Sequence, residues 1–536
     1  MFIRVKPSGQ YRYLPIVENR REGRRTVQRV LATLGRVDQL AASGAVDVLL
    51  RSLGRFAAHV RVIEAQRQGH LEAGTAHQLG PDLVFGRLWQ TVGLQRILTA
   101  LLQERRFEFP VARAVYLTVL HRLFEAGSDR AAERWRRDVH PPGTDGLELH
   151  HLYRAMRWLG ETKEAVEEAL FHQRRDLFTD LTLAFFDTTS MYFEGQGGES
   201  LGPYGHSKDH RPDLRQMVVG AVLTGEGRPV CCELWPGNSA DGRALLPVVD
   251  RLRERFDLRQ VCWVADRGMI SAHTVQELEQ RQLQYILGAR LRRQREVQRE
   301  VLGRAGRYHA VAENLRVKEV RVEGRRYIVC HNPEEAAKDA ADREAILRAL
   351  ADQLQHGATR LVGNRGFRRF LRIAKEAMTI DQAKVQAEAR YDGKFVLRTN
   401  TTLPATEVAV QYKRLLVVEQ FFRATKSLLE TRPIFHQWDA TICGHVFCSF
   451  LALVLVDELQ RGLTARGWRL EWADIRRDLA ALAEVAVRDG EQWYLLRTAL
   501  QGVAGKVLQV VGVAIPPSVR PLPAVVPRPE STPVTH

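Results

Sequence analysis

Three acidic residues occur in surroundings that would suit metal-dependent chemistry on a phosphodiester. Asp187 ends the apolar run 181–187 (LTLAFFD), and Asp266 ends the apolar run 261–266 (VCWVAD). Glu419 lies in residues 404–431, which have the apolar spacing of a helix. Carboxylate oxygens suit Mg²⁺, and two Mg²⁺ ions stabilise both the attacking and the leaving oxygen at phosphorus. We therefore predict that these three residues hold two Mg²⁺ ions, with Mn²⁺ as a substitute and Asp187 as the bridging ligand.

The predicted helix around Glu419 presents further functional groups on one face. Tyr412, Glu419 and Lys426 are spaced seven residues apart. Seven residues rotate an α-helix by about 700°, so each residue lies within about 20° of the next. Arg423 lies one turn beyond Glu419, and the two cations would suit phosphate contacts. The alternative is a surface helix on which Glu419 and Arg423 form an ion pair worth about a few tenths of a kcal/mol.

The elements that must position the two aspartates form an α/β pattern. Strands are predicted at 181–187, 216–223, 229–235, 261–266 and 285–287, with helices at 241–256 and 271–281. The order β-β-β-α-β-α-β is the plan of a ribonuclease-H-like α/β core. Because sites in open α/β sheets lie beyond the carboxyl ends of strands, we expect Asp187 and Asp266 to lie together there.

The rest of the chain divides into segments of different character. A hairpin is expected around the turn Pro7-Ser8-Gly9, a solvated turn at the basic run 20–25, a helix near 340–355 and a strand at 395–398. We predict the following domains: an N-terminal hairpin and basic segment (1–80), a helical DNA-binding region (81–178), the first part of the core (179–289), a β-rich insertion (290–402), the second part of the core with the Glu419 helix (403–460), C-terminal helices (461–514) and a disordered Pro-rich tail (515–536).

Composition indicates the kind of partner and compartment. The 536 residues carry a formal net charge of +16, and the isoelectric point is near 9.8. Such an excess of cations favours a nucleic-acid partner through phosphate neutralisation. The first residues lack the apolar core of a signal peptide, and the longest apolar stretch, 446–456, is too short to span a bilayer. We expect a cytoplasmic, nucleoid-associated protein without a membrane segment.

Three sequence blocks resemble the catalytic blocks of DDE transposases of bacterial insertion sequences. The blocks are 186–190 (FDTTS), 264–269 (VADRGM) and 418–426 (VEQFFRATK). The third block resembles the Tyr-Arg-Glu-Lys helix of the insertion-sequence-four superfamily. Supporting matches are 204–209 (YGHSKD), 234–238 (LWPGN) and 392–395 (DGKF), and the resemblance extends from the N-terminal hairpin to about residue 460.

The resemblance implies cut-and-paste transposition by a ribonuclease-H-like core that is interrupted by a β-rich insertion before the glutamate. It also implies double-stranded DNA as partner, both at terminal inverted repeats and at the target, and a homodimer in the synaptic complex. We expect six residues to contact DNA: Tyr412, Arg414, Arg423, Lys426, Arg267 and Lys394.

Two departures from the family pattern have consequences for DNA contacts. The family's arginine three residues after the tyrosine is Leu415 here, so Arg414 or Arg423 substitutes for it or the contact is missing. Relatives that form DNA hairpins can hold a flipped base with an aromatic residue of the insertion. No tryptophan lies between residues 290 and 402, which leaves as candidates Tyr308, Tyr327, Phe367, Phe370 and Tyr391.

Two other functions compete with an active transposase. A catalytically inactive, transposase-derived DNA-binding protein would have lost a carboxylate or a catalytic block, and all three are present. A ribonuclease-H-like nuclease acting on RNA hybrids or repair intermediates would not need the large basic helical region before the core. Both features favour the transposase.

Overall fold

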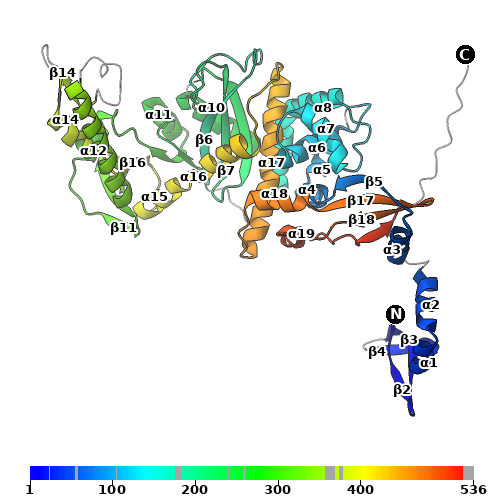
Figure 1. Ribbon diagram of the computed structural model, residues 1–536. Helices are drawn as coiled ribbons and strands as arrows, with labels where there is room; N and C mark the ends of the chain where they lie inside the picture. Colours follow the sequence, from blue (N-terminus) through cyan, green and yellow to red (C-terminus); the bar gives the residue numbers. More distant parts are fainter. Residues whose placement is uncertain are drawn as a thin grey trace, which may run out of the picture. The chain divides into compact units, whose positions relative to one another are not determined.

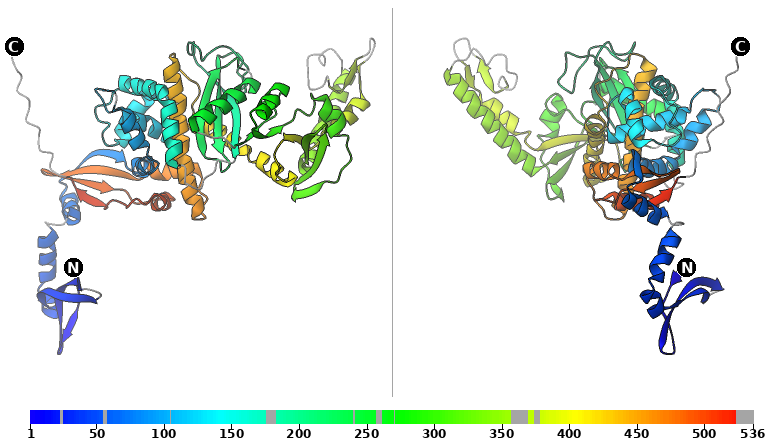
Figure 2. Two further views of the ribbon diagram at one scale, coloured as in Figure 1. Left: turned by 180° about the vertical axis from the view of Figure 1, so that it is seen from behind. Right: turned by 45° about the vertical axis from the view of Figure 1, so that its right-hand side comes forward.

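The computed structural model describes residues 1–22, 25–54, 58–103, 105–174, 183–239, 241–256, 261–269, 271–356, 369–373 and 378–522. The chain forms two compact units (Figures 1 and 2). The first unit combines both ends of the chain, Met1–Gly80 and Glu471–His536, and the second is the continuous segment Pro81–Leu470.

The N-terminal part of the first unit is an antiparallel sheet followed by three short helices. Three strands pair with the long central strand β3 (Tyr11–Glu22): β1 (Phe2–Ile3), β2 (Lys6–Ser8) and β4 (Arg25–Arg36). The helices are α1 (Val37–Ala42), α2 (Ala45–Gly54) and α3 (Ala58–Gln68). The expected hairpin at Pro7-Ser8-Gly9 is confirmed. Of the basic run 20–25, residues 20–22 and 25 are strand, and residues 23–24 lie outside the described residues.

A second sheet in this unit joins the two ends of the chain. Its strand order is β19-β18-β17-β5, formed by β19 (Val519–Pro521), β18 (Gln492–Arg497), β17 (Ala483–Asp489) and β5 (Leu71–Gln78). The prediction of helices alone over 461–514 is therefore wrong, although α18 (Trp472–Ala480) and α19 (Ala504–Val511) are helical. Val487 on β17 and Tyr494 on β18 lie opposite each other and are both buried. The burial in this region therefore follows the two-residue period of strands and not the period of a helix.

The predicted disordered tail begins with ordered residues. Strand β19 pairs with β18, with Val519 opposite Leu496 and Pro521 opposite Tyr494. Disorder is thus the wrong prediction for residues 519–521. Residues 523–536 lie outside the described residues.

The N-terminal part of the second unit is helical, as predicted. It contains α4 (Gly80–Thr91), α5 (Leu94–Leu101), α6 (Val111–Phe124), α7 (Asp129–Val139), α8 (Leu149–Glu161) and α9 (Lys163–Arg174). The later helix α17 (Asp439–Ala465) packs along α8 and also contacts α6 (Figure 1). A Cβ added at Gly160 would lie 1.9 Å from the Ala440 oxygen, and one added at Gly444 would lie 1.8 Å from the Met156 oxygen. These glycines allow α8 and α17 to cross in direct backbone contact.

Helix α17 is long and apolar enough, by length and composition, to cross a membrane. Its most apolar 18-residue window has a mean hydropathy of 1.9, and 78% of that window is buried inside the protein. The apolar surface is thus already covered by α8, α6 and β8 (Pro229–Pro236), as in the core helix of a globular protein.

The first two of the three sequence blocks, 186–190 and 264–269, lie in or directly after strands of a nine-stranded mixed sheet with the order β11-β12-β13-β16-β10-β9-β6-β7-β8. Strands β6 (Leu183–Tyr192), β7 (Gln216–Thr224) and β8 form an antiparallel meander, and β9 (Cys262–Ala265) and β10 (Gln284–Gly288) continue it in parallel to β6. Helices α10 (Asp241–Phe256) and α11 (Ala272–Gln280) connect these strands. The predicted element order is confirmed. The prediction that Asp187 ends its strand is wrong, because β6 continues for five residues beyond it.

The strands of the insertion belong to the same sheet as the core. Strand β16 (Lys394–Thr399) pairs with β10 on one side and with β13 (Arg325–His331) on the other, and β12 (Leu315–Val322) and β11 (His309–Ala312) follow. The insertion also contains η1 (Val297–Val301), α12 (Pro333–His356), α14 (Gln382–Ala389), β14 (Leu371–Ile373) and β15 (Met378–Ile380). It is therefore a mixed α/β segment whose main strands extend the core sheet.

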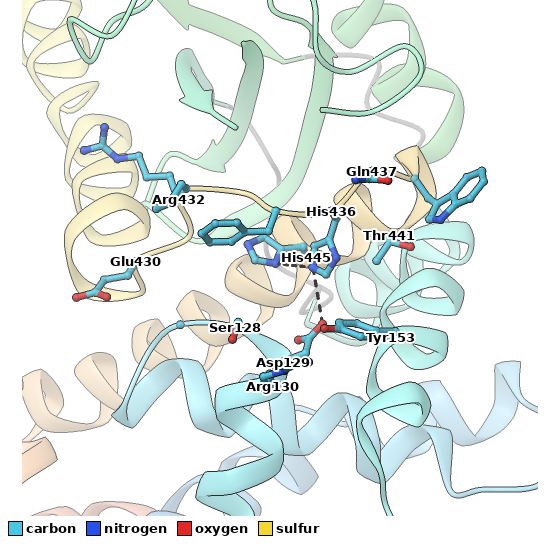
Figure 3. A pocket seen from close by; sticks show the side chains of 14 residues that line it. Ser128, Asp129, Arg130, Tyr153, Glu430, Arg432, His436, Gln437, Thr441 and His445 are labelled. Atoms are coloured by element: carbon cyan, nitrogen blue, oxygen red, sulfur yellow. Dashed lines mark hydrogen bonds and ion pairs between the residues drawn. The ribbon is translucent and has the colours of Figure 1, made fainter. Parts of the chain in front are cut away.

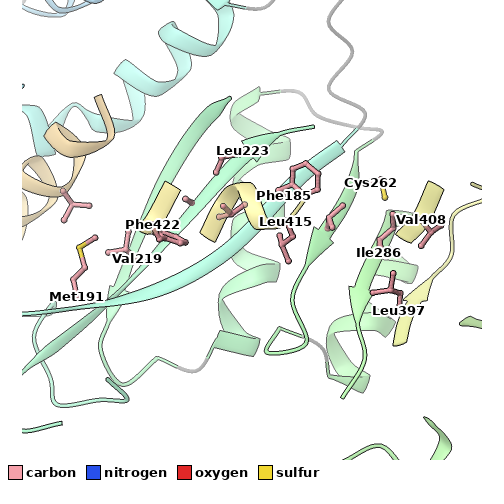
Figure 4. Packing of buried hydrophobic residues seen from close by; sticks show 14 of the residues in the cluster. Phe185, Met191, Val219, Leu223, Cys262, Ile286, Leu397, Val408, Leu415 and Phe422 are labelled. Atoms are coloured by element: carbon pink, nitrogen blue, oxygen red, sulfur yellow. The ribbon is translucent and has the colours of Figure 1, made fainter. Parts of the chain in front are cut away.

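The two faces of the sheet carry separate apolar cores. Phe186, Trp263 and Leu287 pack against α10 and α11 on one face. The alternate residues, including Phe185, pack against α15 (Ala405–Lys413) and α16 (Leu416–Arg423) on the other (Figure 4). Leu415 and Phe422 enter this second core, so both helices are held on the face of the sheet.

The continuous helix predicted over 404–431 is interrupted, which corrects that prediction. The backbone leaves α-helical geometry between α15 and α16, where the N–H groups of Leu415, Val417 and Val418 each bond a carbonyl three residues earlier. A π-helical turn, η3 (Ala424–Leu428), then follows α16. Leu415 and Val418, at this break, are both buried in the core on this face of the sheet.

We expect Gly444→Ala to destabilise the second unit by about 1–3 kcal/mol, because the added methyl would force α17 away from α8. Gly146→Ala is the matched control, since a Cβ there meets nothing within 4 Å. Scanning calorimetry should show a lower unfolding temperature for the first variant alone. Equal unfolding temperatures would contradict this role of Gly444.

Candidate active site

The pairing of two parallel strands brings the two aspartates together. Phe186 on β6 lies opposite Ala265 on β9, so Asp187 and Asp266 follow at equivalent positions on neighbouring strands, about 4.8 Å apart. Side chains alternate along a strand, and the residues two positions earlier on each strand pack beneath α15 and α16. Both carboxylates therefore project from the face that these helices cover.

Glu419 comes from the helix on that same face. It lies in the first turn of α16, which packs against β6 and β7 through the buried residues Val418 and Phe422. Its side chain is exposed. The Glu419 helix therefore lies on the sheet face from which Asp187 projects.

The pKa of Asp187 reflects its burial and the charges around it. Burial raises the pKa of Asp187 to about 6. The Thr188 N–H, 2.7 Å from Asp187 Oδ1, and the Lys208 ammonium oppose this rise. The negative charges of Asp266 and Glu419 add to it. A bound cation would relieve both the burial penalty and the mutual repulsion.

Tyr412 contacts a carboxylate directly. Its hydroxyl donates a hydrogen bond to Asp266 Oδ1 at 2.8 Å, and its ring stacks on Phe395 with centroids 5.8 Å apart. Burial and the Asp266 charge raise the pKa of Tyr412 well above its usual value. A Cβ at Gly288 would lie 2.4 Å from the Tyr412 hydroxyl, so this glycine makes room for the bond. In this structure Tyr412 orients Asp266, whereas a phosphate contact or stacking had been expected.

Lys426 lies in an ion-pair cluster beside the site. Its ammonium is 2.8 Å from Asp209 Oδ1, and Arg432 is 2.5 Å from Asp209 Oδ2. Burial lowers the pKa of Lys426, and the Asp209 carboxylate partly offsets this. The neighbouring Lys208 donates to the Thr188 carbonyl oxygen at 2.8 Å. The loop that carries Lys208 and Asp209 therefore connects β6 with the segment after Glu419.

The motif 204–209 (YGHSKD) contains Lys208 and Asp209, for which the sequence pattern predicted no role. Their partners are 20 and 217 residues away along the chain. The signal for a role of these two residues was the lysine next to an aspartate in this motif.

The other predicted DNA contacts are mostly on the surface. Arg267, Arg414 and Arg423 are exposed, and Lys394, at the start of β16, is half-buried with its ammonium bonded to the Arg390 carbonyl oxygen at 3.0 Å. Arg267 directly follows Asp266.

Arg290 holds the loop after Asp266. Its guanidinium donates to the carbonyl oxygens of Arg267, at 3.0 Å, and Gly268, at 2.8 Å. Leu415, at the family's arginine position, is 5% exposed and belongs to the core, so Arg414 and Arg423 remain the accessible cations there.

The aromatic candidates in the insertion are engaged in packing. Tyr327 and Phe370 are buried. Tyr308 and Tyr391 are half-buried against the apolar cluster around Tyr327. Phe367 lies outside the described residues.

Among the residues that the structure describes, no group of three His, Cys, Asp or Glu side chains is arranged to hold a metal ion. Asp187, Asp266 and Glu419 each offer carboxylate oxygens, which are the donors that Mg²⁺ prefers.

Comparisons with known proteins identify the family of the chain. The family model for the transposase DDE domain matches residues 179–451, about half of the chain, and the model for the N-terminal domain of IS1634 family transposases matches residues 3–66. No curated protein matches the chain. Among solved structures, the piggyBac transposase synaptic complex with hairpin DNA, studied by cryo-electron microscopy, matches with 10% identity and a TM-score of 0.34, covering 75% of this chain and 78% of that chain.

The DDE-domain match begins before Asp187 and ends beyond Glu419, so it includes all three carboxylates and the strands that position two of them. With the IS1634-type N-terminal domain in front of it, the chain belongs to the DDE transposase family and is an enzyme that cleaves DNA and transfers its strands.

Proposed function

We propose that this transposase performs cut-and-paste transposition at the inverted repeats of an insertion sequence, with Asp187, Asp266 and Glu419 as its catalytic carboxylates. The observation that carries the proposal is the placement of Asp187 and Asp266 at matching positions on the paired strands β6 and β9, on the sheet face that the Glu419 helix covers. The order β8-β7-β6-β9-β10, antiparallel and then parallel, supports a ribonuclease-H-like core. The alternatives, an inactive DNA-binding descendant and a nuclease, require the loss of this cluster or the absence of the transposase domains.

Two Mg²⁺ ions, with Mn²⁺ as a substitute, fit this donor set. All three ligands are hard oxygens, and Asp187 is buried where an unpaired anion is costly. Asp187 would be the shared ligand, with Asp266 and Glu419 each completing one ion's protein shell. Bound Mg²⁺ supplies charge stabilisation at the attacking and leaving oxygens.

Residues of the chain itself position these ligands and the DNA. Tyr412 fixes the orientation of Asp266 through its hydroxyl. The exposed cations Arg267, Arg414 and Arg423 would contact backbone phosphates, and Lys394 and Lys426 would add to them from the flanks of the site. Lys426 must exchange its Asp209 partner for a phosphate in order to do so.

The proposed partners are double-stranded DNA at the element ends and at the target, and a second copy of the chain in the synaptic complex. The net charge of +16 supports binding of long DNA in the cytoplasm, at the nucleoid. The helical region 81–178 is proposed to contribute DNA contacts.

We expect Asp187→Ala, Asp266→Ala and Glu419→Ala each to reduce strand cleavage by at least about 100-fold while leaving end binding largely intact, because each removes charge stabilisation from the reaction and not DNA affinity. Single-turnover cleavage of a plasmid that carries two element ends, paired with gel-shift titrations, measures both. Asp213→Ala, on the surface, is the control. A variant that cleaves at the wild-type rate removes its residue from the site.

Tyr412→Phe should raise the Mg²⁺ concentration for half-maximal cleavage by about 10- to 100-fold, because Asp266 loses the hydroxyl that orients it. The aromatic stack with Phe395 survives this substitution. Tyr391→Phe, which also keeps its ring and the contact with Arg292, should behave as wild type. An unchanged Mg²⁺ requirement in Tyr412→Phe would exclude this positioning role.

Asp187→Asn should stabilise the metal-free protein at high pH. The pKa of Asp187 is about 6 in the folded chain and near 3.9 when unfolded, so stability is lost as pH rises through 6. At pH 8 the asparagine variant should gain up to about 3 kcal/mol, and below pH 4 the gain should vanish. Thermal unfolding in chelator from pH 4 to pH 8 measures this.

Exposed Asp342→Asn is the control for the pH series and should show no comparable gain. Added Mg²⁺ should raise the unfolding temperature of the wild type more than that of Asp187→Asn. A pH-independent difference between Asp187→Asn and the wild type would contradict the raised pKa.

A further inference from the structure

A two-stranded ribbon in the first unit carries exposed side chains that the proposed mechanism does not use (Figure 1). From Glu18 and Arg29 onward, β3 and β4 pair only with each other, beyond the residues at which β1 and β2 pair with β3. The side chains at positions 18–21 and 26–29 are all exposed. Residues 18–29 contain five arginines and two glutamates, so the ribbon is a basic surface that attracts a polyanion.

The register of β3 and β4 gives this ribbon two chemically different faces, because residues that lie opposite each other in the pairing share a face. One face carries amide, guanidinium and hydroxyl groups: Asn19 opposite Gln28, and Arg21 opposite Thr26. The other face includes a carboxylate and an apolar side chain: Glu18 opposite Arg29, and Arg20 opposite Val27. We call the first of these the amide face. Since its four residues include no carboxylate, DNA phosphates would approach the ribbon from that side.

Arg4 adds a second guanidinium to the amide face. Its Nη1 donates a hydrogen bond to Gln28 Oε1 at 2.6 Å, which places it on the same side of the ribbon. Within the described part of the chain, the side chains of Asn19, Arg21 and Thr26 have no hydrogen-bond or ion-pair partner. Their donors and acceptors are therefore available to a ligand.

The residue types of the amide face match the edges of base pairs in the major groove of DNA. Asn and Gln form paired hydrogen bonds with adenine, Arg forms them with guanine, and the Thr methyl group contacts the thymine methyl group. The groove is about 12 Å wide and admits a two-stranded ribbon, whose strands lie about 4.8 Å apart. Neutralisation of phosphates alone would require only cations, whereas the pair Asn19 and Gln28 is uncharged. The amide face thus suits base contacts and not only phosphate contacts.

A cavity of about 690 Å³ in the second unit is less suited to contacts with DNA bases (Figure 3). Its buried carboxylate, Asp129, lies 3.7 Å from the His436 ring, and Arg432 is paired with Asp209 at 2.5 Å. These polar groups are engaged inside the protein, whereas those of the amide face are exposed to solvent. The comparison favours the ribbon for sequence recognition.

We propose that the amide face of the β3–β4 ribbon reads base edges in the major groove of double-stranded DNA at the ends of the element. The inference rests on the proposed function for the identity of that DNA, and it assigns sequence recognition to a different unit from the one that carries the carboxylates. Asn19 and Gln28 each bond an adenine in this arrangement, and Arg21 bonds a guanine. Each such contact discriminates against a wrong base pair by about 5- to 150-fold. Arg20, on the opposite face, adds affinity for any sequence through its charge.

The test selects bound DNA from a library of random duplexes with the full chain in chelator. Gel-shift titrations then compare a selected duplex with a shuffled duplex of the same base composition. Arg21→Ala, Asn19→Ala and Gln28→Ala should each reduce the preference for the selected duplex by about 5- to 150-fold. Arg20→Ala, which removes the neighbouring arginine on the opposite face, is the matched control. It should weaken binding to both duplexes equally and keep the preference.

An equal loss of affinity for both duplexes in Arg21→Ala would reduce its role to phosphate neutralisation and overturn the proposal. A wild type that selects no motif would also overturn it, as would variants of the amide face that keep the wild-type preference. The substituted side chains are exposed, and circular dichroism establishes that each variant is folded. Plasmid cleavage is measured separately: a selected motif without cleavage would refute cut-and-paste activity alone, and cleavage without a preference that depends on the amide face would refute base reading alone.

Discussion

The parallel pairing of β6 with β9 is the constraint on which the site depends. Because Phe186 lies opposite Ala265, the next residues of both strands are carboxylates on one face. A slip of one residue would turn Asp266 to the opposite face, beneath α11. The contacts of Tyr412 and Lys208 depend on this register. The Tyr412 hydroxyl donates a hydrogen bond to Asp266, and the positive charge of Lys208 lowers the pKa of Asp187.

Much of this arrangement could be predicted from local pattern, and its limits have a physical origin. Asp266 follows a strand in which all four residues are buried, so its position was recognisable. Asp187 was placed at a strand end because the next residues are polar, yet Thr188, Thr189 and Ser190 are buried strand residues. Lys208 supplies hydrogen bonds to Thr188 and Ser190 from a distant loop. Hydropathy alone does not predict the burial of such polar residues, because their hydrogen-bond partners come from another segment of the chain.

The features that sequence reasoning missed all depend on contacts between distant segments. The seven-residue spacing predicted Tyr412 and Glu419 on one face of a continuous helix, but the helix is broken between α15 and α16, where Leu415 is buried in the core. Lys426 faces Asp209, which lies 217 residues earlier, so its partner could not be read from its own helix. Strand β17 was missed although it pairs with the neighbouring strand β18, and its other partner, β5, lies more than 400 residues earlier in the chain.

That last pairing has a consequence for synthesis. Strand β5 is complete once residue 78 has been made, but its partner β17 ends at residue 489. At about 5–20 residues per second, the ribosome needs roughly 20–80 seconds to make the residues between them. The second sheet of the first unit can therefore form only after residue 489 has been made, and a chain terminated before β17 would lack this sheet. Assembly of the first unit thus depends on the synthesis of a segment that follows the whole second unit.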